Sequence, residues 1–180
     1  MLILLLSYFW LMIPAYLANF TPVFFRKINF LNYPVDFKKT FHGQRIFGDN
    51  KTFRGFFFGV SFGVLVFYVQ KVLYSHFDAI RAIALFDYSS STLFVGFLLS
   101  FGALFFDSVK SFFKRQLRLS PGTSWPPFDQ VDYAIGAVLF LSFSVSISFF
   151  DSLGIVIFSG ILHFISTIFG YYAGLRKDKW

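Results

Sequence analysis

Four stretches of this chain stay apolar over about twenty consecutive residues, and no other feature restricts its fold as strongly. A helix rises 1.5 Å per residue, so roughly 20 apolar residues are needed to cross the ~30 Å hydrocarbon core of a bilayer. Charged residues make up only 14% of the chain, against about 25% in ordinary soluble domains. The sequence therefore predicts an all-α integral membrane protein with spans at about residues 2–20, 53–73, 131–150 and 153–172.

A fifth span is predicted between the second and third of these stretches. The apolar run 92–106 is too short to cross the bilayer by itself, so we extend its helix to about residues 88–113, which leaves Asp107 near membrane depth. The last two spans are separated only around residues 150–154, which indicates an antiparallel hairpin. The chain is thus predicted to form one transmembrane domain, residues 1–180, built as a bundle of five helices. No cleavage signal follows the first span, so we expect it to be retained.

Basic residues predict the orientation of this bundle. Of the 16 Lys and Arg residues, all but Lys71 and Arg81 lie in three segments: 26–54, 110–118 and 176–179. Because basic residues are enriched on the cytoplasmic side of membranes, we expect the N-terminus outside and the C-terminus in the cytoplasm. Two long loops then face the cytoplasm, at about residues 26–52 and 114–130. For Arg26, Lys27 and the C-terminal basic residues, topology and contact with anionic lipids are a sufficient explanation.

Charged residues beside the third and fourth predicted spans indicate a site for a metal ion and phosphates. One helix face, within an arc of roughly 60° at about 100° per residue, holds a carboxylate, a hydroxyl and two cations: Asp107, Ser111, Lys114 and Arg118. Asp129 and Asp132, three residues apart, share a second face. Carboxylates bind hard divalent cations, and cations hold phosphates.

Three Asp residues at one end of a bundle repel one another unless cations lie between them. Lys114, Arg115 and a bound Mg²⁺ would supply that compensation. A simpler alternative treats Lys114 and Arg115 as interfacial anchors and residues 116–128 as a proline-rich linker. That alternative leaves Asp129 and Asp132 unexplained, since acidic residues gain nothing beside a negatively charged membrane surface.

The loop before the second span contains a further group of hydrogen-bond donors. Its glycines allow close approach of the backbone to a ligand, and its polar residues suit phosphates; they are Arg45, Asn50, Lys51, Thr52 and Arg54. The alternative is structural, with residues 48–50 forming a turn and Asp49 or Asn50 capping the second helix. The loop matches neither the phosphate loop of nucleotide triphosphatases nor the dinucleotide fingerprint.

Other features favour packing over chemistry. Gly55, Gly59 and Gly63 recur every fourth residue and predict a groove that lets a neighbouring helix approach closely. His163 lies in the middle of the fifth predicted span without a second His or Cys placed to chelate with it, so we expect a packed histidine rather than a metal ligand. The absence of cysteine excludes disulfides and thiolate metal sites.

Two separated motifs carry a resemblance to a known family. The series Asp107, Ser111, Lys114-Arg115, a Pro-Gly loop and Asp129-Gln-Val-Asp132 resembles the signature of the phosphatidate cytidylyltransferase family of membrane enzymes. With the stretch 47–55 and the small size, the chain looks most similar to its archaeal branch, the CDP-archaeol synthases. It departs from the bacterial pattern in having fewer spans, no His-Gly-Gly before Asp129, and Gln130 where Arg is frequent. These departures favour an ether lipid over an ester lipid as substrate.

The resemblance implies that CTP reacts with 2,3-bis-O-geranylgeranylglycerol 1-phosphate to give a CDP-lipid and pyrophosphate at the cytoplasmic face of the cell membrane. It implies three groups of site residues. Asp107, Asp129 and Asp132 would hold Mg²⁺, alone or with a second cation, and Lys114 and Arg115 would neutralise phosphates. Asn50, Lys51, Thr52, Arg54 and Ser111 would bind nucleotide or phosphate. Membrane lipids are further expected partners, and nucleic acid is not.

Two other classes of function stay open from the residues alone. A small transporter or channel could use the Asp residues as an ion site, but ionisable residues should then lie on both sides of the membrane midplane. A scaffold protein with a basic, lipid-binding face would keep its activity when Asp129 is replaced. The oligomeric state and the residues that read the cytosine base are not predicted.

Overall fold

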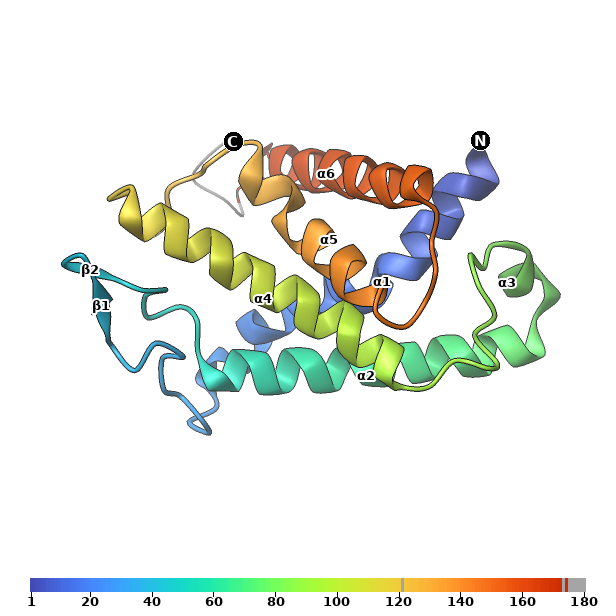
Figure 1. Cartoon of the computed structure of the whole chain (residues 1–180), viewed down its shortest axis with the longest axis horizontal. Coiled ribbons are helices and arrows are strands. Elements are labelled where there is room, and N and C mark those ends of the chain that lie inside the picture. The colour runs from blue at the N-terminus through green and yellow to red at the C-terminus, as the bar shows by residue number, and fades with distance from the viewer. Residues whose placement is uncertain (121, 173, 175–180) are drawn as a thin grey trace.

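The computed structural model describes residues 1–120, 122–172 and 174 of the chain, and its regular secondary structure is almost entirely helical (Figure 1). The five longest helices are α1 (Leu2–Phe24), α2 (Phe53–His76), α4 (Phe94–Gln116), α5 (Phe128–Leu141) and α6 (Phe149–Tyr172). The short elements are η1 (Phe25–Lys27), α3 (Asp78–Ala82) and the paired strands β1 (Thr40–Phe41) and β2 (Gln44–Arg45). The all-α prediction is confirmed apart from this minimal hairpin. The predicted C-terminal basic segment, 176–179, lies outside the described residues.

Among the described residues, four helices are long and apolar enough to cross a membrane: α1 with η1, α2, α4 and α6. Large apolar side chains are exposed along them, for example Leu2, Phe57 and Phe169. Such side chains are stable where hydrocarbon rather than water surrounds the helices, because lipid is as apolar as they are. The structure therefore agrees with the prediction of a protein that crosses the membrane several times.

α5 is shorter than the predicted span 131–150. Its 14 residues extend about 21 Å at 1.5 Å per residue, less than the ~30 Å of a bilayer core. The next seven residues, 142–148, alternate serine with apolar residues, a period of two that does not suit a helix. The Ser148 hydroxyl then accepts a bond from the Asp151 N–H (3.0 Å) and starts α6. The predicted connection at 150–154 is therefore wrong, the count of five spans is not confirmed, and the orientation stays a prediction.

α4 begins six residues later and ends three residues later than the predicted span 88–113. The residues before it form a turn in which the Asp87 carbonyl accepts a bond from the Ser91 hydroxyl (2.8 Å). Tyr88 is fully buried in this turn and stacks on neighbouring aromatic rings. Beyond the other end of α4, Arg118 takes a left-handed conformation with φ of 58°. Arg118 therefore leaves the helix face on which it was predicted.

The predicted packing role of the glycine stripe in α2 is confirmed. All three glycines are buried: Gly55 packs against Pro22 of α1, and Gly59 and Gly63 lie between α1 and α4. A Cβ atom on Gly59 would lie only 2.8 Å from the Ala18 carbonyl oxygen of α1, and one on Gly63 would overlap Ser100 of α4. Small residues at these positions therefore allow three helix backbones to approach closely.

A second close approach joins α4 and α5, which run in opposite directions (Figure 1). A Cβ atom on Gly102 or on Gly136 would overlap the carbonyl of the other glycine, so the two backbones touch here. Asp107 lies five residues after Gly102, and Asp132 lies four residues before Gly136. Because the helices are antiparallel, these two steps lead toward the same end of the molecule.

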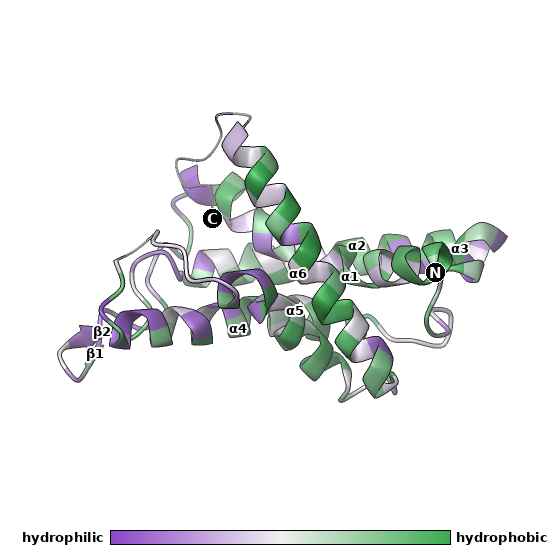
Figure 2. Cartoon of the chain, turned by 90° about the horizontal axis from the view of Figure 1, so that it is seen from above, coloured by the Kyte–Doolittle hydropathy of each residue, from purple (hydrophilic) through white to green (hydrophobic). Residues whose placement is uncertain are grey.

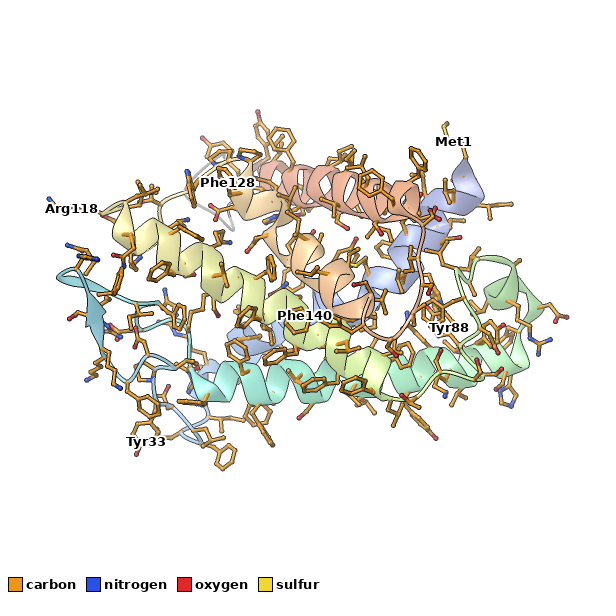
Figure 3. All side chains as sticks on the ribbon, viewed as in Figure 1. Met1, Tyr33, Tyr88, Arg118, Phe128 and Phe140 are labelled. Atoms are coloured by element: carbon orange, nitrogen blue, oxygen red, sulfur yellow. The ribbon has the colours of Figure 1, made fainter. Side chains whose placement is uncertain are left out.

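This end also holds the first long loop. Hydrophilic residues gather around β1, β2 and the end of α4, whereas the middle parts of the helices are mainly apolar (Figure 2). Figure 3 shows Arg118 and Phe128 at this end of the molecule, with Met1 at the other. The loops before α2 and before α5 therefore both lie at the end of the molecule where α4 ends (Figure 1).

Candidate active site

Three carboxylates from α4 and α5 converge on one ammonium group. Lys110 Nζ lies 3.1 Å from Asp107 Oδ1, 3.1 Å from Asp129 Oδ1 and 2.9 Å from Asp132 Oδ2. All four side chains are largely buried. We call Asp107, Asp129 and Asp132 the carboxylate cluster. Sequence reasoning grouped these three residues but treated Lys110 only as part of a basic segment. Its spacing of three residues from Asp107 on the same helix is the signal that could have identified it.

Lys51 joins the first long loop to the carboxylate cluster. Its ammonium pairs with the second oxygen of Asp107, 56 residues away in the chain. The backbone around Lys51 is held as well, because its carbonyl accepts a bond from the Val35 N–H (2.8 Å). The ion pair therefore holds the loop against α4 and places the Lys51 ammonium beside the carboxylate cluster.

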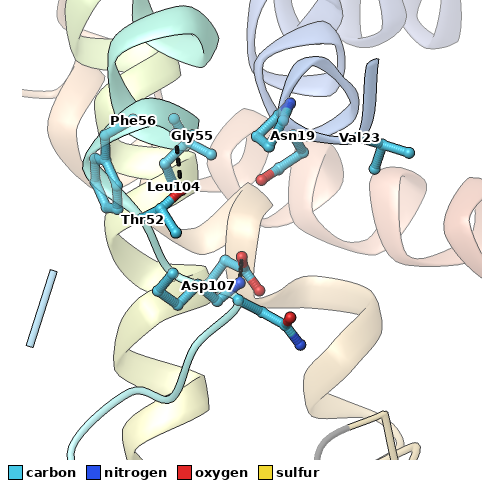
Figure 4. A pocket seen from close by; sticks show the side chains of 10 residues that line it. Asn19, Val23, Thr52, Gly55, Phe56, Leu104 and Asp107 are labelled. Atoms are coloured by element: carbon cyan, nitrogen blue, oxygen red, sulfur yellow. Dashed lines mark hydrogen bonds and ion pairs between the residues drawn. The ribbon is translucent and has the colours of Figure 1, made fainter. Parts of the chain in front are cut away.

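A pocket of about 190 Å³ adjoins this ion pair (Figure 4). Asn19 of α1 faces the loop residue Thr52 across it, with Asp107 nearby. The wall combines two kinds of residue. The polar group is Asn19, Asn50, Lys51, Thr52 and Asp107, and the apolar group includes Pro22, Val23, Phe56 and Leu104. A polar group attached to a hydrocarbon chain would find partners for both parts here.

Asp129 also organises the loop before α5. Its Oδ2 atom accepts a bond from the Trp125 N–H (2.6 Å) and lies 3.1 Å from Lys114 Nζ. Lys114 donates in addition to the Thr123 carbonyl. Lys114 is thus a member of the cluster's charge network and a support for the loop at the same time.

Arg115 lies close to residues of both long loops. Its Cδ atom is the nearest atom to a Cβ placed on Gly48, at 4.0 Å, and its Nη2 group donates to the Ser120 carbonyl (3.2 Å). Its Nε atom is buried and has no hydrogen-bond partner among the described residues. A buried donor without a partner is costly, so this N–H favours binding of an acceptor such as a phosphate oxygen.

Ser111, Thr52 and Arg54 make structural bonds. The Ser111 hydroxyl donates to the Asp107 carbonyl (2.8 Å), within its own helix. Thr52 caps α2 by accepting a bond from the Gly55 N–H (3.1 Å), so the expectation that Asp49 or Asn50 would be the cap is wrong. Arg54 is buried and donates to the Ile28 carbonyl (2.6 Å). Of the predicted phosphate-binding residues in this loop, Asn50, Lys51 and Thr52 line the pocket.

Asp36 holds the first loop together, and sequence reasoning did not single it out. Its buried carboxylate accepts bonds from the backbone N–H groups of Lys38, Phe47 and Gly48 at 2.9, 2.9 and 3.0 Å and pairs with Arg45 at 2.9 Å. Burial alone would raise the pKa of Asp36, but these donors outweigh it and lower the pKa from 3.8 to about 2.

Asp36→Asn is expected to lower the free energy of unfolding by about 2 kcal/mol at pH 7. The folded pKa is the lower one, so this contribution is present above pH 4 and is lost as the pH falls toward 2. Thermal unfolding of the detergent-purified protein at pH 7 and pH 3 measures it. Asp49→Asn is the matched control, because its exposed carboxylate pairs with the same Arg45. Equal unfolding temperatures of the two variants at pH 7 would contradict the assignment.

The carboxylate cluster has the donor chemistry of a site for a hard divalent cation. Among the described residues, however, no three His, Cys, Asp or Glu side chains are arranged to hold a metal ion as they stand. The point nearest to all three carboxylates is taken by Lys110 Nζ. The three carboxylates are therefore suitable ligands for Mg²⁺, but the Lys110 side chain must move before they can surround the ion. The ring of His163 packs edge-on with the ring of Tyr133.

Comparison with known proteins gives consistent matches along the whole chain. The model of a family described as "CarS-like: CDP-archaeol synthase" matches residues 1–180. A CDP-archaeol synthase of Methanococcoides burtonii is 34% identical over 179 residues, which cover 94% of this chain and 100% of the relative. A CDP-archaeol synthase of Methanosarcina mazei is 38% identical over 181 residues, which cover 94% of this chain and 100% of the relative. One of Pyrobaculum islandicum is 34% identical over 177 residues, with 97% and 99% covered.

A solved structure resembles the fold as well. It was reported as "Structural insight into an intramembrane enzyme for archaeal membrane lipids biosynthesis" and superposes with a TM-score of 0.68 at 25% sequence identity. The match covers 88% of this chain and 91% of the other. The sequence relatives and the structural relative thus point to the same class of membrane enzyme.

Proposed function

Because this chain belongs to the CarS-like CDP-archaeol synthase family, we propose that it transfers the cytidylyl group of CTP to an archaeal lipid phosphate. The acceptor is 2,3-bis-O-geranylgeranylglycerol 1-phosphate, and the products are the CDP-activated ether lipid (CDP-archaeol) and pyrophosphate. Membership of this family favours the enzyme over the transporter and scaffold interpretations. The observation that carries the proposal is the carboxylate cluster with its lysines beside a pocket that is polar on one side and apolar on the other.

The pocket is suited to the head of the lipid phosphate. Its volume of about 190 Å³ is below the ~300–1,000 Å³ of sites that enclose whole drug-sized ligands. Its apolar wall includes Val23, which is 70% exposed, and the next residue of α1, Phe24, is exposed as well. A lipid can therefore enter sideways from the bilayer, with its phosphate near Lys51 and its prenyl chains along α1.

In the proposed reaction, an oxygen of the lipid phosphate attacks the α-phosphorus of CTP. The new P–O bond forms as the bond between the α-phosphorus and the bridging oxygen breaks, and the electron pair leaves with pyrophosphate. A dianionic phosphate is already a nucleophile near neutral pH, so no general base is needed. Catalysis then consists of positioning the two phosphates and neutralising their charge.

Lys51, Lys114 and Arg115 would provide that neutralisation. Lys51 reaches the pocket from the first loop, and Lys114 lies beside Asp129. The Nε–H of Arg115, which has no partner among the described residues, would donate to a phosphate oxygen. Asp107, Asp129 and Asp132 are the residues that would hold Mg²⁺, alone or with a second cation, and the bound metal supplies further charge neutralisation on phosphate oxygens. The distribution of basic residues supports a cytoplasmic site, where CTP is available.

A substrate panel tests the function. The detergent-purified full chain is incubated with each of the four nucleoside triphosphates and with ether or ester lipid phosphates, and pyrophosphate release is measured with Mg²⁺ or with EDTA. We expect release only with CTP, only with a lipid phosphate and Mg²⁺, and fastest with the ether lipid. Absence of release with every combination would overturn the proposal.

A further inference from the structure

Lys110 is the residue at the centre of the carboxylate cluster that the proposed reaction does not use. Its Nζ atom contacts one oxygen of each of the three Asp residues at 2.9–3.1 Å, and its side chain is only 14% exposed. An ammonium group surrounded by three carboxylate oxygens occupies the place where a bound cation would be expected. Lys110 therefore stands in for a cation while no substrate is bound.

The charges of the cluster balance without a metal ion. Asp107 is paired with Lys51 and Asp129 with Lys114, in addition to their shared contact with Lys110. Asp132 is ion-paired only with Lys110 among the described residues, although its carboxylate is 8% exposed. Three lysines thus match three aspartates one for one. A divalent cation placed at the same point would have to displace Lys110, because two cations within a few ångströms repel strongly in a buried site.

We propose that Lys110 is a positioning residue. Its ammonium occupies the position of the divalent cation in the carboxylate cluster until the metal ion arrives bound to nucleotide. The inference rests on the proposed function, because it needs a triphosphate to give the displaced ammonium a new partner. Four rotatable bonds allow the Lys110 ammonium to move from the carboxylates to nearby phosphate oxygens. The chain would then take up its divalent cation together with nucleotide, and would bind the free ion poorly.

Binding of Mn²⁺, a paramagnetic substitute for Mg²⁺, tests this order without any turnover. Electron paramagnetic resonance counts bound Mn²⁺ on the detergent-purified full chain, with and without cytidine 5′-(α,β-methylene)triphosphate, which cannot be cleaved. We expect the affinity of wild-type protein for Mn²⁺ to be at least about 10-fold higher with the nucleotide than without it. A sample of nucleotide without protein gives the Mn²⁺ that the nucleotide binds by itself, and this amount is subtracted. Lys110→Met should bind Mn²⁺ without nucleotide at least about 10-fold more tightly than wild type.

Two further variants separate this role from a structural one. Lys110→Arg keeps the charge and should restore weak binding of free Mn²⁺, whereas Lys71→Met, a lysine at the far end of α2 that donates to the Ser91 carbonyl, should behave as wild type. Equal affinity of wild type and Lys110→Met for free Mn²⁺ would overturn the proposal. So would tight binding of free Mn²⁺ to wild type, a result that does not depend on the folding of any variant. Failure of the proposed function would appear instead as absent pyrophosphate release, which this measurement does not use.

Discussion

Asp132→Asn is expected to reduce CTP-dependent pyrophosphate release by roughly 10³-fold, the size of effect seen when a preorganised electrostatic partner of a reacting group is removed. Asp132 is the sharpest choice within the carboxylate cluster. Its side chain is ion-paired only with Lys110 among the described residues, whereas Asp129 also holds the Trp125 backbone. The substitution preserves volume and removes charge, so lost activity reports on cation and phosphate binding. The measurement is the initial rate with the ether lipid phosphate and Mg²⁺.

Asp78→Asn is the control for this experiment. Asp78 is exposed in α3 at the opposite end of the molecule and pairs with Arg81, so its loss should leave the rate within about twofold of wild type, as for most surface substitutions. Asp129→Asn should lose activity as strongly as Asp132→Asn and should also unfold at a lower temperature. Turnover at the wild-type rate in Asp132→Asn would refute the assignment of the carboxylate cluster to catalysis.

Lys51→Met is expected to lower kcat/KM for CTP by about 10²–10³-fold. The side chain supplies the cation that reaches Asp107 and lines the pocket from the first loop. Methionine keeps most of the length of the side chain, and the backbone bonds around residue 51 remain. The loop should therefore keep its place while Asp107 loses its partner and the phosphates lose a neutralising charge. Steady-state kinetics over a range of CTP concentrations gives the change.

Lys39→Met is the matched control, because Lys39 is exposed in the same loop. It should leave kcat/KM unchanged, while Lys51→Arg should recover part of the activity because it restores the charge without the geometry of an ammonium. If Lys51→Met and Lys39→Met had the same kinetics, Lys51 would be a topology signal and no part of the site.

The positions of the membrane helices illustrate how far local sequence can predict this fold. Runs of apolar residues near 53–73 and 153–172 correspond to α2 and α6, because the transfer of a side chain into hydrocarbon depends on that side chain alone. The end of α5 was missed. The segment 142–148 lies within the predicted span, yet its alternating serines do not continue the helix.

Within the site, the sequence could not predict which side chains contact one another. The three Asp residues were grouped from their spacing and their position beside apolar spans. Lys110 and Asp36 were not recognised, because their importance comes from partners on other elements or up to 12 residues away. Arg54 is a residue type that often binds phosphate, but here it is buried and donates to the Ile28 carbonyl. Only the folded loop creates this contact.

The residues alone predicted a helical membrane protein, a helix-packing role for the glycines in α2, and the motifs of a lipid cytidylyltransferase. Each of these properties depends on residues within one or two segments. Tertiary contacts set which lysine each Asp contacts and place one ammonium among all three carboxylates. The physical reason is the backbone contact of Gly102 with Gly136. It sets the register between α4 and α5, and a shift of one residue there would turn Asp132 by about 100° away from Lys110.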